Sequence, residues 1–91
     1  MKVLRPYEEI TDALETLNLP FLISKNDIKK QYHFLVKKNH PDVGGDENVM
    51  KKINFSYKVL MKYIDNFRFS FTEEEISKQF SGAIYAEQFK P

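Results

Sequence analysis

The chain has 91 residues, 14 lysines and arginines against 13 acids, a formal net charge of +1, and no cysteine. This length suits one small domain, and the lack of cysteine excludes a disulfide framework and any thiolate zinc site. No apolar run approaches the ~20 residues that span a bilayer, and the first residues lack the apolar core of a signal peptide. We therefore expect a cytoplasmic protein with one function, a binding one, and no membrane segment in this chain.

The first predicted helix covers roughly residues 7 to 17. Pro6 suits a first helical turn, and Glu8 and Glu9 favour a helix N-terminus through the macrodipole. Apolar residues then recur at helical spacing, namely Ile10, Ala13, Leu14 and Leu17. Asn18-Leu19-Pro20 should end this helix, and the apolar run Phe21-Leu22-Ile23 that follows is too short for periodicity to assign.

A second helix is predicted from Ser24 to about Asn39, because Ser24 with Asp27 three residues later is a variant of the capping box. One face of this helix is apolar and consists of Ile28, Tyr32, Leu35 and Val36. The neighbouring face is basic and consists of Lys29, Lys30, His33 and Lys37. A lysine stripe is most often a solvated surface, but this one leads directly to an unusual tripeptide. Phe34 lies outside the apolar face, and its expected partner is the chain's own C-terminal segment.

The tripeptide His40-Pro41-Asp42 forms the start of a fixed polar loop. Pro41 cannot continue a helix and pushes the preceding residue away from helical angles, while Gly44 and Gly45 let the chain turn back. An imidazole that donates or accepts stands beside a carboxylate that only accepts, which suits docking better than chemistry. A structural role, in which Pro41 ends the helix and Asp42 satisfies loop N–H groups, explains the proline but gives no reason for the imidazole.

Catalysis and metal binding find little support in these residues. A dyad of His40 and Asp42 would need a nucleophile and a pocket, and the histidines, His33 and His40, have no matching third ligand. We expect no enzymatic activity, no metal and no cofactor.

A third helix is predicted from Asp46 or Glu47 to about Asp65. Its apolar stripe consists of Met50, Ile53, Tyr57, Leu60, Met61 and Ile64. This stripe should pack against the second helix as an antiparallel pair, with the first helix across both. Residues 67–71 alternate between apolar and polar residues, as in a strand, but have no obvious partner strand.

Thr72 and Glu75 form a capping box for a short helix through about Phe80, ended by Gly82. The aromatic and apolar residues beyond, Ile84, Tyr85 and Phe89, are too many for an ordinary disordered tail, and either dock on the domain or await a partner.

Taken together, these elements resemble a J-domain, the co-chaperone module of DnaJ-type proteins. The matching residues are Ile28-Lys29-Lys30-Gln31-Tyr32, Leu35-Val36, His40-Pro41-Asp42, Met50-Lys51-Lys52-Ile53-Asn54 and Tyr57-Lys58-Val59-Leu60. The resemblance covers roughly residues 7 to 64. It predicts an all-α J-domain at 1–66, with a helical hairpin and a short first helix across it. An atypical extension at 67–91 should contain a short helix docked on the domain.

The resemblance also implies a function. In the family, the tripeptide docks on a DnaK-type chaperone and the basic helix docks on acidic surface there, which accelerates ATP hydrolysis by the chaperone and promotes client capture. The implied partner-binding residues are His40, Pro41, Asp42, Lys29, Lys30, Tyr32, His33 and Lys37. A further implication is that the apolar residues of the loop at 21–23 plug the core.

The chain also departs from the family pattern, which leaves alternatives open. His33 and Phe34 stand where the family usually carries basic residues, and the usual fourth helix is replaced by an acidic segment. One alternative is a J-like scaffold for protein assembly that no longer stimulates the ATPase. Another is nucleic-acid binding through the lysine-rich helix, against which the near-neutral net charge argues. We expect a monomer that binds no nucleic acid, and the C-terminal aromatics are candidates for binding a client or a further chain.

Overall fold

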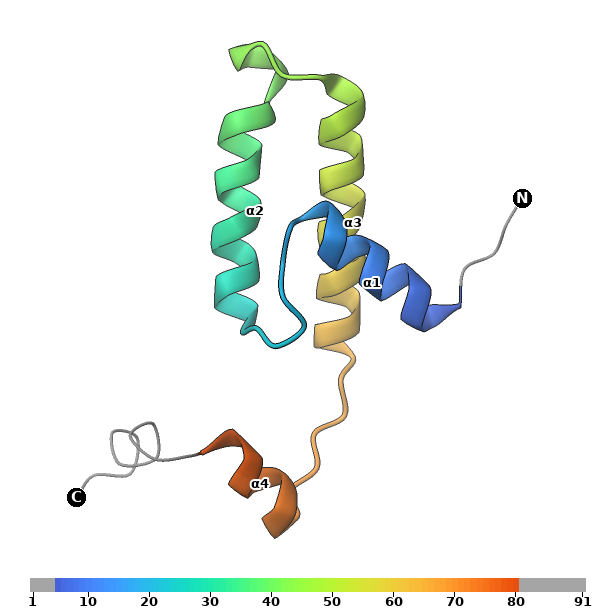
Figure 1. Cartoon of the computed structure of the whole chain (residues 1–91), viewed down its shortest axis with the longest axis vertical. Helices are drawn as coiled ribbons and strands as arrows, with labels where there is room; N and C mark the ends of the chain where they lie inside the picture. The colour runs from blue at the N-terminus through green and yellow to red at the C-terminus, as the bar shows by residue number, and fades with distance from the viewer. Residues whose placement is uncertain (1–4, 81–91) are drawn as a thin grey trace, which may run out of the picture.

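A computed structural model of the chain describes residues 5–80, in which every regular element is helical. In chain order these elements are α1 (Pro6–Thr16), α2 (Lys25–Asn39), the 3-10 turn η1 (Pro41–Val43), α3 (Glu47–Asp65) and α4 (Glu73–Gln79). Figure 1 shows α2 and α3 side by side as an antiparallel hairpin, with η1 at its tip and α1 crossing α3. The predicted all-α fold, with a short first helix on a helical hairpin, is confirmed.

The end of α1 is the centre of the core. Leu17, the residue that follows α1, is 0% exposed, and its carbonyl accepts a hydrogen bond of 3.0 Å from the side-chain amide of Gln31 on α2. Around it pack the other buried apolar residues, Ala13, Leu14, Ile28, Met50, Ile53 and Leu60. The helical spacing of these residues in the sequence therefore identified the core correctly.

The loop between α1 and α2 corrects one expectation. Phe21 is 78% and Leu22 is 95% exposed, so neither plugs the core, and only Ile23 packs against it. Upstream of these residues, Asn18 adopts a positive φ of 56°, and Leu19 is partly buried against the core. Phe21, although exposed, borders an apolar pocket that Leu14 also lines.

Capping side chains and cross-helix contacts hold the hairpin. The Ser24 hydroxyl accepts from the Asp27 N–H at 3.1 Å and begins α2, and the Asp46 carboxylate accepts from the Asn48 N–H at 2.7 Å and begins α3. Lys25 pairs with Asp65 at 3.0 Å, which joins the first turn of α2 to the last turn of α3. These contacts fix the hairpin at both ends.

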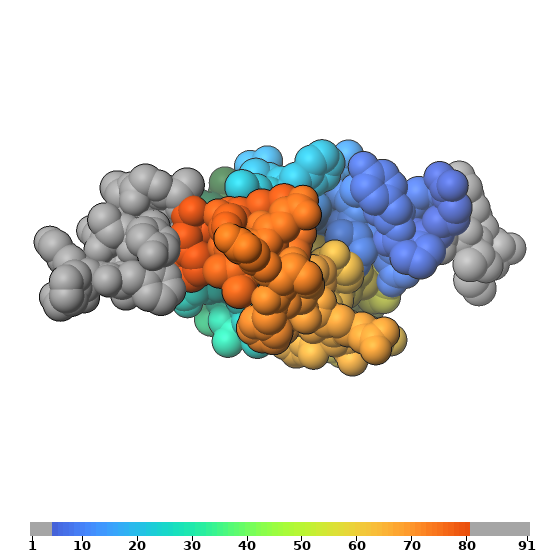
Figure 2. Space-filling view, turned by 90° about the horizontal axis from the view of Figure 1, so that it is seen from below, coloured from blue at the N-terminus to red at the C-terminus, as the bar shows by residue number. Residues whose placement is uncertain are grey.

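The short helix α4 begins as predicted, since the Thr72 hydroxyl accepts from the Glu75 N–H at 3.3 Å. In Figures 1 and 2, α4 and the segment before it project from the end of the hairpin that is opposite η1. Residues 67–71 form neither helix nor strand, and Ile76 on α4 is 43% exposed. Docking of α4 on the domain stays a prediction, and those made for Gly82, Ile84, Tyr85 and Phe89 fall outside the described residues. Between residues 5 and 80, no helix is long and apolar enough to cross a membrane.

Candidate functional site

The tip of the hairpin is a tight loop held by its own backbone. The carbonyl of His40 accepts from the N–H groups of Val43 and Gly45, both at 3.0 Å, and the carbonyl of Pro41 accepts from the Gly44 N–H at 3.0 Å. The His40 N–H in turn donates to the carbonyl of Val36 at 2.9 Å, the last hydrogen bond of α2. The tripeptide is therefore anchored at its first residue to the end of α2.

Both glycines of the loop are required by its shape. Gly44 has a φ of 85°, in the left-handed region that favours glycine. Gly45 meets a different limit, because a Cβ placed on it would overlap the backbone carbonyl group of Asn39. The chain thus returns to α3 by passing directly over the end of α2, which only a residue without a side chain permits.

His40, and not Asp42 as in the structural alternative, satisfies an N–H group of the loop. The Nδ1 atom of His40 accepts a hydrogen bond of 3.1 Å from the backbone N–H of Asp42, so the imidazole caps the 3-10 turn. In this arrangement the proton of the neutral ring is on Nε2, where it can be donated outward. The structure therefore supplies a local reason for the imidazole.

The Asp42 carboxylate, in contrast, satisfies no N–H group of the loop. Its side chain is 88% exposed, and within residues 5–80 its only recorded polar neighbour is the His40 Nδ1 atom, 3.5 Å from Oδ2. A carboxylate presented this way, beside a rigid proline and on a backbone held by hydrogen bonds, is available to a cationic group of a partner. Sequence reasoning missed the cap made by His40, although its position before Pro41 is that of an N-cap residue.

The basic side chains predicted on α2 are exposed as expected. Lys29, Lys30, His33 and Lys37 all lie on the solvent side of the helix, and among the described residues none of the three lysines forms an ion pair. Positions 29, 33 and 37 are four residues apart and share one face of α2, which leads along the helix toward Asp42 at the tip. The structure thus presents these basic residues on α2 and the carboxylate on η1, which follows α2 after His40.

Tyr32 is placed differently from the other predicted site residues. Its ring stacks on Tyr57 of α3 with a centroid distance of 3.9 Å and an interplanar angle of 10°, and its hydroxyl donates to the Asn54 side-chain carbonyl at 2.7 Å. The side chain is half-buried between the two helices. Tyr32 therefore joins α2 to α3 and contributes only an edge to the exposed surface.

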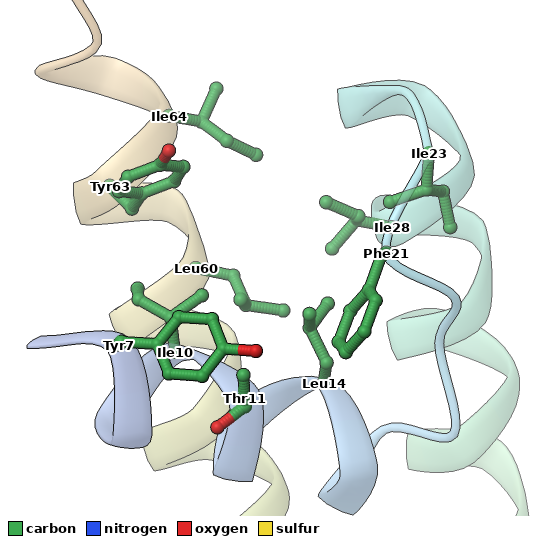
Figure 3. Close-up of a pocket in the computed structure, with 10 residues that line it drawn as sticks. All are labelled: Tyr7, Ile10, Thr11, Leu14, Phe21, Ile23, Ile28, Leu60, Tyr63 and Ile64. Carbon is green, nitrogen blue, oxygen red and sulfur yellow. The ribbon is translucent and has the colours of Figure 1, made fainter.

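No catalytic or metal arrangement accompanies the loop. Residues 5–80 contain no group of three or more His, Cys, Asp or Glu side chains that could hold a metal ion. A pocket of about 320 Å³ lies between α1, the loop before α2, and α3 (Figure 3), and no residue of the loop at 40–45 lines it. Its lining carries no carboxylate, imidazole or amine: Tyr7, Ile10, Thr11, Leu14, Phe21, Ile23, Ile28, Leu60, Tyr63 and Ile64. The candidate site is consequently a protruding loop and helix face, a form that suits contact with another macromolecule.

Comparison with known proteins gives the family. The DnaJ domain model matches residues 7–65. "Chaperone protein dnaJ A6" of Oryza sativa subsp. japonica is 40% identical over 55 residues, which cover 60% of this chain and 13% of that protein. "Chaperone protein DnaJ" of Rippkaea orientalis and that of Bacillus mycoides are each 44% identical over 52 residues, covering 54% of this chain and 14% of each relative.

No solved structure matches the chain. The aligned part is only 13% to 14% of the length of these curated relatives, so it corresponds to one region of a much longer protein in each case. The family match ends at Asp65, the last residue of α3, and leaves α4 outside. Because the match covers more than half of the chain, with nearly all of α1 and the whole of α2, η1 and α3, the chain belongs to the DnaJ domain family.

Proposed function

We propose that this protein is a co-chaperone that stimulates ATP hydrolysis by a DnaK-type chaperone and promotes client capture. The observation that supports this most directly is the exposed Asp42 carboxylate on a rigid loop, in a chain of the DnaJ domain family. The relatives that share this region are themselves named as DnaJ chaperone proteins. The proposal places the protein in a reducing compartment, the cytoplasm, which the lack of cysteine fits.

In this proposal the residues of the tip have separate tasks. Asp42 engages a cationic group of the chaperone, where a charge-assisted hydrogen bond contributes most when water is excluded. Pro41 keeps the tip rigid, and His40 holds the backbone of Asp42 in place while it offers Nε2–H to the partner. A preformed loop loses little conformational entropy on binding.

The basic face of α2 steers the encounter. Lys29, Lys30 and Lys37, which have no ion-pair partner within residues 5–80, attract an acidic surface over a distance set by the ionic strength, about 10 Å at 0.1 M salt. His33 adds an exposed polar contact on the same face. The expected result is fast association that weakens as salt is raised.

Stimulation of the ATPase requires no chemistry from this chain. A binding partner accelerates a reaction of the chaperone when it binds the hydrolysis-competent state more tightly than the other states. The protein is then a population-shifting ligand and not an enzyme. The exposed aromatic residues Phe69 and Phe71 are candidates for contact with a client or with a further chain.

The test is single-turnover ATP hydrolysis by a DnaK-type chaperone, measured with and without the protein. Asp42→Asn removes the charge and retains the size of the side chain, and we expect it to abolish the acceleration while thermal unfolding stays unchanged. Asp12→Asn is the matched control, because Asp12 is an exposed carboxylate of α1 with no role in the loop. Equal acceleration by the wild-type protein and Asp42→Asn would contradict the proposal.

A second candidate function is a J-like assembly module without stimulation. Phe34, which is 58% exposed on α2, supports this candidate, because it places an apolar side chain on a face that is expected to be basic. The described residues leave it uncovered, and the predicted covering segment at 81–91 lies outside them. A folded wild-type protein that binds partners through Phe34 and does not accelerate hydrolysis would favour this second function.

A further inference from the structure

A second concave surface lies between α1 and α3, on the side of α3 that α2 does not reach. It is a groove of about 770 Å³, a size typical of binding sites. Its floor is apolar and aromatic and is made by Tyr7, Ile10, Phe55, Val59 and Tyr63. It adjoins the pocket of Figure 3, with which it shares Tyr7, Ile10 and Tyr63. This groove, which we call the α1–α3 groove, belongs to neither the loop nor the basic face of α2.

The walls of the α1–α3 groove carry opposite charges. Lys58 and Lys62 line it from α3, four residues apart on one helix face, and Glu9 lines it from α1. Within residues 5–80 none of these three side chains has an ion-pair partner. The groove therefore fits an amphipathic element that has an apolar stripe, acids on one side and a base on the other.

Helix α4 supplies the acids, the base and one apolar residue. Its first turn is acidic, with Glu73, Glu74 and Glu75, and its last turn contains Lys78. Within residues 5–80, Lys78 pairs only with Glu74 and Glu75 of its own helix, at 3.7 and 3.2 Å, and the three side chains are 60%, 81% and 46% exposed. The apolar residue of the helix, Ile76, is 43% exposed.

A helix of this length is not stable without packing. α4 has 7 residues, whereas isolated helices shorter than about 12 to 15 residues are marginal in water. The capping bond of Thr72 stabilises the first turn by about 1 kcal/mol, which does not replace a buried apolar face. α4 therefore needs a surface on which Ile76 can be buried.

The segment before α4 can bring it to the groove. Residues 66–72 separate α3 from α4, and seven residues can span about 23 Å. The groove follows α3 from Phe55 to Asn66, a distance of about 17 Å along a helix. The segment already begins on the groove side, because Phe67 meets Tyr63 edge to face at 5.7 Å and Phe69 meets Phe67 at 5.5 Å.

We propose that the α1–α3 groove is a docking surface for an acidic amphipathic helix, and that its occupant is α4 of the same chain. An α4 antiparallel to α3 places its acidic first turn beside Lys62 and Lys58 and Ile76 over the apolar floor, and Lys78 is the matching charge for Glu9. The short connection favours the same chain over a second copy, because a short linker gives effective concentrations in the millimolar range. Docking there leaves His40 and the basic face of α2 open, so it is independent of the proposed chaperone contact.

A single spin label tests this arrangement. The chain has no cysteine, so Ser77→Cys gives one labelling site on α4. We expect the label to broaden the amide NMR signals of Phe55 to Val59 in the groove, and to leave those at the end of α2, Lys37 to Asn39, unaffected. Lys58→Glu/Lys62→Glu should lower the ratio of docked to undocked chains by about two- to fivefold, as expected for exposed ion pairs. Adding Glu74→Lys/Glu75→Lys to Lys58→Glu/Lys62→Glu should restore the ratio of docked to undocked chains.

Matched controls separate the possible outcomes. Lys51→Glu/Lys52→Glu changes two exposed lysines of α3 that do not line the groove, and it should leave the broadening intact. The proposal is overturned if the label on the otherwise wild-type chain does not broaden the signals of Phe55 to Val59. It is also overturned if Lys58→Glu/Lys62→Glu leaves that broadening unchanged. Broadening of an unlabelled, isotope-enriched chain by an added spin-labelled chain overturns the intramolecular occupant and assigns the groove to a second copy.

Discussion

The Cα of Gly45 lies against the backbone carbonyl of Asn39, and no Cβ fits between them. This close approach lets the chain leave η1 and enter α3 directly over the last residue of α2. It sets the separation of the two helices at the tip and with it the position of the tripeptide that the tip presents. Replacing one Cα hydrogen of Gly45 with a methyl group should consequently displace the whole loop.

Gly45→Ala is expected to lower the free energy of unfolding by about 1–3 kcal/mol, the usual cost of forcing a methyl group into a filled space. Urea unfolding followed by circular dichroism measures this. Gly44→Ala and Gly44→Asn are the comparison pair, because Gly44 has open space around it and only its positive φ matters. Gly44→Asn should cost less than Gly44→Ala, since Asn tolerates the left-handed region better. A Gly45→Ala protein as stable as wild type would show that the tip can relax away from Asn39.

The cap formed by His40 leads to a second prediction. His40→Ala removes the acceptor of the Asp42 N–H, and we expect faster hydrogen exchange of that amide and a loss of about 1 kcal/mol in stability. His40→Asn places a carbonyl oxygen near the position of Nδ1, so it should retain most of the protection. NMR-detected exchange at Asp42 distinguishes the two variants. Unchanged protection in His40→Ala would show that the imidazole does not hold the turn.

Tyr32 should behave as a residue that supports the hairpin. Its hydroxyl bond to Asn54 predicts that Tyr32→Phe and Asn54→Ala are coupled by about 0.5–1 kcal/mol in a double-mutant cycle on the free energy of unfolding. We further expect Tyr32→Phe to leave stimulation of the chaperone nearly unchanged. A strong loss of stimulation with unchanged stability would instead place the Tyr32 hydroxyl in the chaperone contact.

The basic face of α2 predicts a salt-dependent effect. Lys29→Gln/Lys37→Gln should weaken binding to the chaperone at low ionic strength, chiefly through slower association, and the difference from wild type should shrink as salt is raised from about 0.05 to 0.5 M. Binding kinetics at a series of salt concentrations provide the measurement. Lys52→Gln, an exposed lysine on α3, is the control and should follow the wild type. A deficit that persists at high salt would indicate a close contact of these lysines instead of steering.

The parts of the fold that could be predicted are those that local chemistry decides. The capping pairs at Ser24 and Thr72 and the stop at Pro41 each act within a few residues, and the structure has each where the sequence placed it. The apolar stripe of α3 could be predicted equally well, because a 3.6-residue period sustained over a long helix identifies the face that is buried. These local signals were enough to establish the helical hairpin.

The features that could not be predicted depend on the conformation of loops and turns or on the packing of helices that are far apart in the sequence. A three-residue apolar run such as 21–23 has no periodicity to orient it, and the structure exposes Phe21 and Leu22 while Ile23 packs against the core. The acceptor role of His40 depends on the conformation of η1, and the stacking of Tyr32 on Tyr57 depends on the register between two helices. At the candidate site, the residue types and the exposure of the basic face of α2 could therefore be predicted, but not the cap formed by His40 or the stacking of Tyr32 on Tyr57.

Every hydrogen bond that holds the tip has both partners within residues 36–45, from the carbonyl of Val36 to the N–H of Gly45. Within residues 5–80, the hydrogen bonds of the tip therefore involve neither the core nor α1 nor α4. Such a segment is portable: it should keep its shape when transplanted between the ends of any two antiparallel helices of the same spacing. It also closes through contacts between near neighbours in sequence, so it should form early as the chain folds.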